Sequence, residues 1–280
     1  MQVRRVAGAL GAEILGVNLR DPDLDFDAVY GAFLEHEVIF FRGAHLTEEE
    51  HLALGRRFGT PSIYPVARVM GATEPTMTVI KDGPNSPNAA DRWHTDVTWI
   101  ATPPKAALLH MDLAAEYGGD TLWASATRAY ETLSPAVQEF FASLTVVHSN
   151  EGYLERVAEK AGERAEAITE AIARDYGPVE HPLVRTHPET GKRALLYAEG
   201  FVSHVAGVSR AESDMVFNFL REHVAEPSLH CRWQWQNGDL AIWDERSTLH
   251  RSAADHFPQR RIIRRLEIDG DRPYFDPNGS

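Results

Sequence analysis

The residues best suited to chemistry are the imidazole of His94 and the carboxylate of Asp96, in the segment WHTDVTW at 93–99. This segment alternates like a β-strand, and on a strand two residues two positions apart point to the same face. We therefore expect the two side chains to lie side by side, where imidazole and carboxylate together suit a divalent transition metal. His250, far along the chain, is the candidate third ligand. Two histidines and one carboxylate on one side of an iron leave its other side open for dioxygen and substrate-derived ligands.

This spacing is weak evidence by itself. The chain has 13 histidines, and the segments HMD at 110–112 and HPE at 187–189 repeat the pattern. The first segment lies in an apolar run, where a histidine paired with its own neighbours is the simpler interpretation. The second segment lies in a turn, and we expect it at the surface. The interpretation of His94 and Asp96 as ligands therefore needs support from other parts of the chain.

A second chemical signal is the arginine-rich segment RRIIRRLE at 260–267. Strand alternation places Arg261 and Arg265 on one face and the arginines beside them on the other. Whichever face looks inward buries guanidinium groups, which is costly unless an anion pairs with them. Arg261 and Arg265 would lie about 13 Å apart, which is enough to hold two anions across a small cavity. A solvated basic edge strand, which protects a sheet edge from aggregation, is the alternative.

The elements that position these residues follow from hydrophobic spacing and capping signals. Apolar residues three and four apart predict a helix over 26–37, and a capping box at Thr47 and Glu50 predicts a helix through about 58. A further helix is expected at 209–224, and strands are expected at 38–41, 77–80, 93–100, 106–113, 181–186, 194–198, 229–235, 239–243 and 261–268. Many strands with few helices predict an α+β fold with a mainly antiparallel sheet or barrel, and not β-α-β alternation.

We expect a single domain over 1–280 with two irregular parts. Residues 59–92 contain several prolines, glycines and asparagines, and a loop of this length is usually a lid or a substrate-binding segment. Residues 127–176 are expected to form a helical insertion. Its stretch from 155 to 175 is rich in alanine and glutamate, as expected of a solvated amphipathic helix.

Composition limits the function. The chain carries 41 acidic and 28 basic residues, a formal net charge of −13, so we expect neither nucleic acid nor an anionic membrane as a partner. The single cysteine, Cys231, excludes an intramolecular disulfide and a cysteine-rich zinc site. We find neither a secretory signal nor an apolar stretch of eighteen residues. These features predict a cytoplasmic enzyme or binding protein.

Several ordered motifs resemble the taurine dioxygenase (TauD/TfdA) family of Fe(II)- and 2-oxoglutarate-dependent oxygenases. The motifs are WHTDVTW at 93–99, GGDTLW at 118–123, WDER at 243–246 ahead of His250, and PQRRIIRR at 258–265. The similarity runs nearly end to end, through FFRG at 40–43, RFG at 57–59 and HPETG at 187–191. Several motifs in matching order are far more specific than any one of them.

The resemblance implies a double-stranded β-helix (jelly roll) core with N-terminal helices and a central helical insertion. The iron ligands that it implies are His94, Asp96 and His250. Arg261 would bind the distal carboxylate of 2-oxoglutarate through a bidentate contact, and the Thr121 hydroxyl would donate to the same carboxylate. Arg265 falls where the family contacts either the anionic group of the substrate or the inner carboxylate of the co-substrate.

The resemblance also implies the reaction. Three protein ligands leave three iron positions, of which 2-oxoglutarate takes two and O2 one. Oxidative decarboxylation then gives succinate and CO2 while the substrate is hydroxylated, and the protein supplies orientation and exclusion of water. Asp96 favours hydroxylation, because related halogenases carry a small residue at this position. Family members are commonly dimers or tetramers, so we expect a homo-oligomer.

The substrate side departs from the taurine pattern. Taurine dioxygenases use a histidine, a tyrosine and an asparagine before the iron motif, and the matching positions here carry Tyr64, Ala67 and Ala90. A site without these polar groups no longer selects a substrate that carries an amine, such as taurine. The residues expected around the substrate are Tyr64, Val97, Phe201 and Arg265. We therefore expect a small anion with an apolar body, such as an organosulfonate or alkyl sulfate, hydroxylated next to its heteroatom.

Three alternatives remain open from the sequence. The first is a hydroxylase of the same superfamily that acts on a carboxylated amino-acid-like, aryloxyalkanoate or secondary-metabolite substrate. The second is a jelly-roll protein that binds anions without catalysis, which the complete ligand and arginine set disfavours. The third is a zinc hydrolase with the same three ligands, which would turn over without 2-oxoglutarate.

Overall fold

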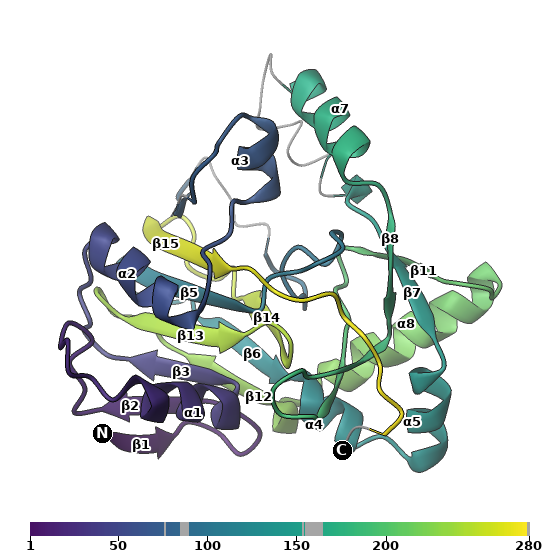
Figure 1. The fold of residues 1–280 in the computed structure, drawn as a ribbon, viewed down its shortest axis with the longest axis horizontal. Helices are drawn as coiled ribbons and strands as arrows, with labels where there is room; N and C mark the ends of the chain where they lie inside the picture. Colours follow the sequence, from purple (N-terminus) through teal and green to yellow (C-terminus); the bar gives the residue numbers. More distant parts are fainter. Residues whose placement is uncertain (76, 85–89, 153, 155–164, 279–280) are drawn as a thin grey trace.

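A seven-stranded sheet carries the arginine-rich segment in the computed structural model of this chain (Figure 1). The structure describes residues 1–75, 77–84, 90–152, 154 and 165–278. The strands of the sheet are β1 (Gln2–Arg5), β2 (Ala12–Leu15), β3 (Val38–Phe41), β4 (Thr78–Asp82), β5 (Ala106–Leu113), β13 (Leu240–Asp244) and β15 (Arg261–Ile268). Their order is β1-β2-β3-β13-β5-β15-β4, with β2 and β3 parallel and the other neighbours antiparallel.

A three-stranded sheet packs against one face of the large sheet. Its strands are β12 (His230–Trp233), β6 (Thr121–Ser125) and β14 (Thr248–Ser252), in that order. Aromatic rings fill the space between the sheets, with Phe40 of β3 stacked on Trp233 at 4.2 Å between ring centroids. Trp123 of β6 lies 5.7 Å from Trp243 of β13. Because side chains alternate along a strand, every second residue of β3, β5 and β13 contributes to this inner core.

Two N-terminal helices cover the other face of the large sheet. They are α1 (Phe26–His36) and α2 (Glu48–Phe58), and α2 begins with the predicted capping box at Thr47 and Glu50. Their rings pack edge to face, with Phe33 and Phe58 at 5.3 Å. A side chain at Gly55 would overlap Leu266 of β15, so glycine permits the close approach of α2 to the strand. The predictions for both helices and for β3 are confirmed to within a residue or two.

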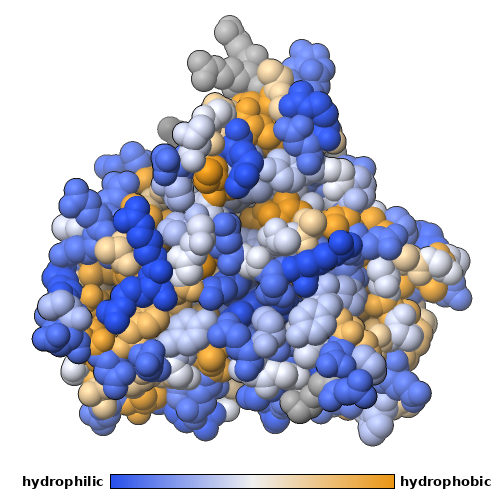
Figure 2. Space-filling model, viewed as in Figure 1, coloured by the Kyte–Doolittle hydropathy of each residue, from blue (hydrophilic) through white to orange (hydrophobic). Residues whose placement is uncertain are grey.

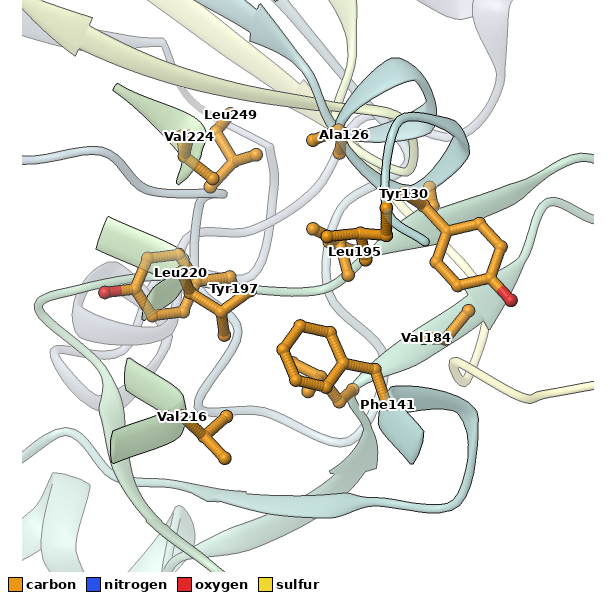
Figure 3. Packing of buried hydrophobic residues seen from close by; sticks show 14 of the residues in the cluster. Ala126, Tyr130, Phe141, Val184, Leu195, Tyr197, Val216, Leu220, Val224 and Leu249 are labelled. Carbon is orange, nitrogen blue, oxygen red and sulfur yellow. The ribbon is translucent and has the colours of Figure 1, made fainter. Parts of the chain in front are cut away.

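A second hydrophobic core covers the outer face of the three-stranded sheet (Figure 3). The helices that build it are α4 (Ala126–Glu131), α5 (Pro135–Ala142), α8 (Arg210–Val224) and the short 3-10 helix η2 (Pro227–Leu229). The remaining strands form two small sheets, β9 (Val184–Thr186) with β10 (Arg193–Leu195), and β11 (Val202–Val205) with β7 (Thr145–His148) and β8 (Val179–Pro182). Leu249 of β14 and Leu220 of α8 are fully buried in this core.

The two irregular parts differ from expectation. The predicted helical insertion over 127–176 contains a strand, β7, whose residues Thr145–His148 pair with β8 and β11. Helix α7 (Ala165–Asp175) is the described part of the predicted amphipathic helix, and residues 155–164 of that prediction lie outside the described residues. The expected loop over 59–92 contains the helix α3 (Pro65–Val69) as well as β4. No helix among the described residues is long and apolar enough to cross a membrane.

Candidate active site

The histidine of the motif at 93–99 is anchored to β14, but the motif is not a strand. His94 pairs with His250 as an isolated bridge, and the two backbones donate to each other over 3.0 and 2.8 Å. The next residues form a turn, in which Val97 has a φ of 54°. The prediction of a strand over 93–100 is therefore wrong. Local alternation favours a strand, but the Asp96 backbone N–H donates to a buried side chain, Glu245, at 3.0 Å, and this tertiary contact outweighs the local preference.

The three predicted ligands nevertheless converge. One ligand atom from each of His94, Asp96 and His250 lies within 4.8 Å of the other two. The His94 Nε2 atom is 3.6 Å from Asp96 Oδ1, and the His250 Nε2 atom is 3.8 Å from Asp96 Oδ2. His94 Nδ1 lies 2.8 Å from the Arg92 carbonyl oxygen, so this nitrogen donates and Nε2 presents its lone pair to the centre. The three groups could therefore hold one divalent ion.

The protonation of the cluster also suits a metal. Burial alone would raise the pKa of Asp96, but the charges of Arg265, His250 and His94 outweigh it and hold that pKa at about 2. Burial lowers the pKa of His250 well below its usual value, and the neighbouring His94 lowers it further. The site thus offers a carboxylate and a neutral imidazole at neutral pH, which are the forms that bind metals.

Arg265 lies between the ligand cluster and a second buried carboxyl group. Its Nη1 donates to Asp96 Oδ2 at 2.8 Å, and its Nη2 lies 3.1 Å from Glu267 Oε1. Its Nε is buried without a hydrogen-bond partner among the described residues. Burial raises the pKa of Glu267 to about 7, although Arg265 lowers it and Asp96 raises it further. Arg265 also lines a pocket together with His94 and His250, so its positive charge faces a space close to the ligand cluster where an additional anion could bind.

A pocket extends from the ligand cluster along the inner face of β15. Its lining includes His94, Leu109, Met111, Thr121, Trp235, His250, Ser252, Arg261, Ile263 and Arg265. Arg261 and Arg265 line the same pocket, as strand alternation predicted. The Trp235 indole donates to Thr121 Oγ1 at 3.0 Å, which leaves the hydroxyl hydrogen available to a ligand. The structure thus brings the three predicted co-substrate residues to one pocket.

Arg261 has a protein partner that the sequence did not reveal. Its Nε and Nη2 donate to Asp82 Oδ2 at 2.9 and 2.7 Å, and its Nη1 donates to the Gly119 carbonyl at 2.7 Å. Asp82 lies directly opposite Arg261 in the β4–β15 register. A guanidinium has five N–H groups, so these three bonds leave two for a ligand. Asp82 fixes the orientation of Arg261 without consuming all of its donors.

A second cavity has a volume of about 480 Å³. Its lining includes Val97, which follows the ligand Asp96 in the chain, and Glu267, which forms an ion pair with Arg265. Val97 also shares a hydrophobic cluster with Tyr64 and Phe201, built by α3 and α7. These helices lie side by side at the top of Figure 1, and Figure 2 shows apolar atoms at the surface between them. Three of the four predicted substrate residues therefore lie together.

The two histidines with similar spacing lie away from this site. His110 Nδ1 is 2.8 Å from Asp112, and its Nε2 accepts the Leu46 backbone N–H, which fits the structural interpretation. His187 is buried, with its Nε2 3.0 Å from Asp244 Oδ2, so the prediction of a surface position is wrong. The turn after it is closed by backbone N–H groups that donate to His187 Nδ1, which draws the imidazole inward.

Two imidazoles and one carboxylate beside an arginine-lined pocket form the donor set of a non-haem iron(II) oxygenase. The model of the taurine catabolism dioxygenase TauD, TfdA family matches residues 2–266, and the chain belongs to this family. It is an oxidoreductase of the dioxygenase class, with iron(II), 2-oxoglutarate and O2 as its cofactor and co-substrates.

Individual relatives cover almost the whole chain. An alkylsulfatase of Acinetobacter baylyi is 37% identical over 276 residues, which cover 97% of this chain and 86% of the relative. An alpha-ketoglutarate-dependent sulfate ester dioxygenase of Pseudomonas putida is 37% identical over 278 residues, which cover 98% and 91%. The crystal structure of a taurine dioxygenase from Burkholderia xenovorans superposes with a TM-score of 0.81 at 31% identity, covering 100% of this chain and 94% of that one.

Proposed function

We propose that this dioxygenase hydroxylates a small organosulfur anion, a sulfate ester or a sulfonate, at the carbon next to the heteroatom. The observation that carries the proposal is Arg265, a guanidinium that donates to the ligand Asp96 and lines the pocket beside the ligand cluster. The similarity to an alkylsulfatase and a sulfate ester dioxygenase supports a sulfate ester as the first choice.

One set of residues would bind the metal ion, and a second set would bind 2-oxoglutarate. His94, Asp96 and His250 would hold iron(II), which supplies the activation of O2 when bound. Arg261, with two N–H groups left, would hold the distal carboxylate of 2-oxoglutarate, and the Thr121 hydroxyl would donate to it. These contacts orient the keto acid toward the three ligands. Arg265 would then orient the anionic head of the substrate, or the inner carboxylate of the co-substrate.

The atoms of the proposed reaction balance. One oxygen atom of O2 enters succinate as 2-oxoglutarate loses CO2, and the other becomes the hydroxyl group on the substrate carbon. With a sulfate ester, this product is a hemiacetal-like sulfate. Its C–O bond to sulfate then breaks as the new hydroxyl loses its proton, which gives an aldehyde and hydrogen sulfate. With a sulfonate, the C–S bond breaks in the same way and releases sulfite.

The body of the substrate would lie in the cavity of about 480 Å³. A volume of this size is typical of small-molecule sites. Ile63, Pro65, Val97 and Trp99 give it apolar walls, and Tyr64 and Phe201 pack in the cluster behind Val97. An apolar body attached to an anionic head would fit such a cavity next to Arg265.

We further infer that the two facing sheets form the double-stranded β-helix expected for this family, as one domain over 1–280. The packing of the three-stranded sheet on the seven-stranded sheet supports this arrangement. A homo-oligomer stays a prediction from the resemblance, and a cytoplasmic location stays a prediction from the sequence. Light scattering of the purified protein tests the oligomeric state.

A substrate panel tests the proposal. Alkyl sulfates of increasing length, alkanesulfonates and aryloxyalkanoates are incubated with iron(II), 2-oxoglutarate and O2, and succinate, sulfate and sulfite are measured. We expect sulfate release in a 1:1 ratio to succinate for at least one alkyl sulfate. Arg265→Gln should abolish this coupling, whereas Arg264→Gln, a neighbour on the opposite face that pairs with Asp112, should preserve it. Succinate coupled only to an aryloxyalkanoate would overturn the organosulfur assignment.

A further inference from the structure

A buried carboxyl group lies directly behind two of the metal ligands. The Glu245 side chain, in the turn between β13 and β14, has no exposed surface. Its Oε2 accepts the backbone N–H of Asp96 at 3.0 Å, and its Oε1 accepts the indole N–H of Trp243 at 2.6 Å. Glu245 therefore fixes the backbone of one ligand, and Trp243 fixes the orientation of Glu245.

The same carboxyl group faces the other side of a second ligand. His250 Nδ1 lies 4.0 Å from Glu245 Oε2 and has no hydrogen-bond partner among the described residues. A neutral histidine that binds a metal through Nε2 carries its proton on Nδ1, and that buried N–H needs an acceptor. His94 already has one, because its Nδ1 lies 2.8 Å from the Arg92 carbonyl. For His250, Glu245 is the group in position.

We propose that Glu245 is a positioning residue of the metal centre. It holds the Asp96 backbone in its turn and accepts the Nδ1–H of His250 once a metal occupies Nε2. The present 4.0 Å separation must shorten by about 1 Å to reach hydrogen-bond length, and catalytic hydrogen bonds are often long before the ligand is bound. The affinity of the site for a divalent metal therefore depends on a side chain that does not touch the metal.

Metal titration of the purified apoprotein tests this role without turnover. Co(II) is the probe, and its visible absorption in the site reports the Kd of wild type, Glu245→Gln and the control Glu37→Gln. Glu37 is another buried glutamate, and it makes no hydrogen bond or ion pair with the three ligands among the described residues. We expect Glu245→Gln to weaken Co(II) binding about 10- to 100-fold, and Glu37→Gln to change it less than twofold. An unchanged Kd in folded Glu245→Gln would overturn the proposal.

A measurement on the unaltered protein keeps the proposal testable if the variant fails to fold. In protein loaded with Zn(II) and labelled with 15N-histidine, the His250 Nδ1–H should give a resonance protected from solvent exchange and shifted by its carboxylate acceptor. A His250 Nδ1 without a proton, or one whose proton exchanges as fast as that of an exposed imidazole, would show that Glu245 does not accept from it.

Discussion

Replacing Arg261 with lysine keeps the positive charge but removes the forked shape of the guanidinium. Arg261 donates three hydrogen bonds to Asp82 and the Gly119 carbonyl and keeps two N–H groups. A lysine offers three N–H groups on one nitrogen. One must stay with the buried Asp82 and one with the Gly119 carbonyl, so a single N–H is left where arginine keeps two. The bidentate contact to the distal carboxylate of 2-oxoglutarate would then lose at least one charge-assisted hydrogen bond.

The magnitude follows from that count. One hydrogen bond to a charged group contributes about 1.5–3 kcal/mol. Since about 1.4 kcal/mol corresponds to a tenfold change in affinity, Arg261→Lys should weaken 2-oxoglutarate binding between about 10- and 150-fold. The assay is an anaerobic titration of the iron(II)-loaded protein with 2-oxoglutarate, followed by the metal-to-ligand charge-transfer absorption and by calorimetry.

The matched control is the same substitution on the other face of the strand. Arg264 donates to both carboxylate oxygens of Asp112 and to the Leu46 carbonyl, away from the pocket. Arg264→Lys should therefore leave the affinity for 2-oxoglutarate unchanged. If Arg261→Lys bound 2-oxoglutarate as tightly as wild type, or if both variants lost affinity equally, the assignment of Arg261 as the co-substrate anchor would be wrong.

Two further predictions concern stability and turnover. His94→Ala should abolish succinate formation. It should lower the thermal midpoint of unfolding by no more than about 4 °C, because the bridge to His250 is made by backbone atoms that the substitution keeps. Metal-dependent turnover in this variant would contradict the ligand assignment. Burial raises the pKa of Glu37 from 4.5 to about 8, so the folded state holds a proton that the unfolded chain releases. Its contribution to stability is complete below pH 4.5 and is lost as the pH rises to about 8, by at most about 5 kcal/mol. Glu37→Gln should flatten this decline in urea unfolding between pH 5 and 8, and an equal slope in both proteins would refute it.

Regular elements with a strong local signal were predictable. The three- and four-residue spacing of 26–37 and the capping box at Thr47 correspond to α1 and α2. Alternation alone placed Arg261 and Arg265 on one face of β15, and both line the pocket. In these segments local preference and tertiary packing agree, which is why pattern reasoning is sufficient.

The contacts that shape the site depend on distant parts of the chain. The motif at 93–99 has the alternation of a strand, but the Glu245 carboxyl group holds the Asp96 backbone in a turn. Asp82 reaches Arg261 only because β4 pairs with β15 in one particular register. These strands are far apart in the chain, so no hairpin turn fixes that register. The ligands could thus be proposed from residue type and family resemblance, whereas the groups that orient them required the fold.

The reciprocal backbone hydrogen bonds between His94 and His250 imply that folding and metal binding are separate steps. Both imidazoles are held together by main-chain atoms, so the chain can complete its folding before any ion arrives. A purified, chelator-stripped sample should consequently accept cobalt, manganese or zinc in place of iron without refolding.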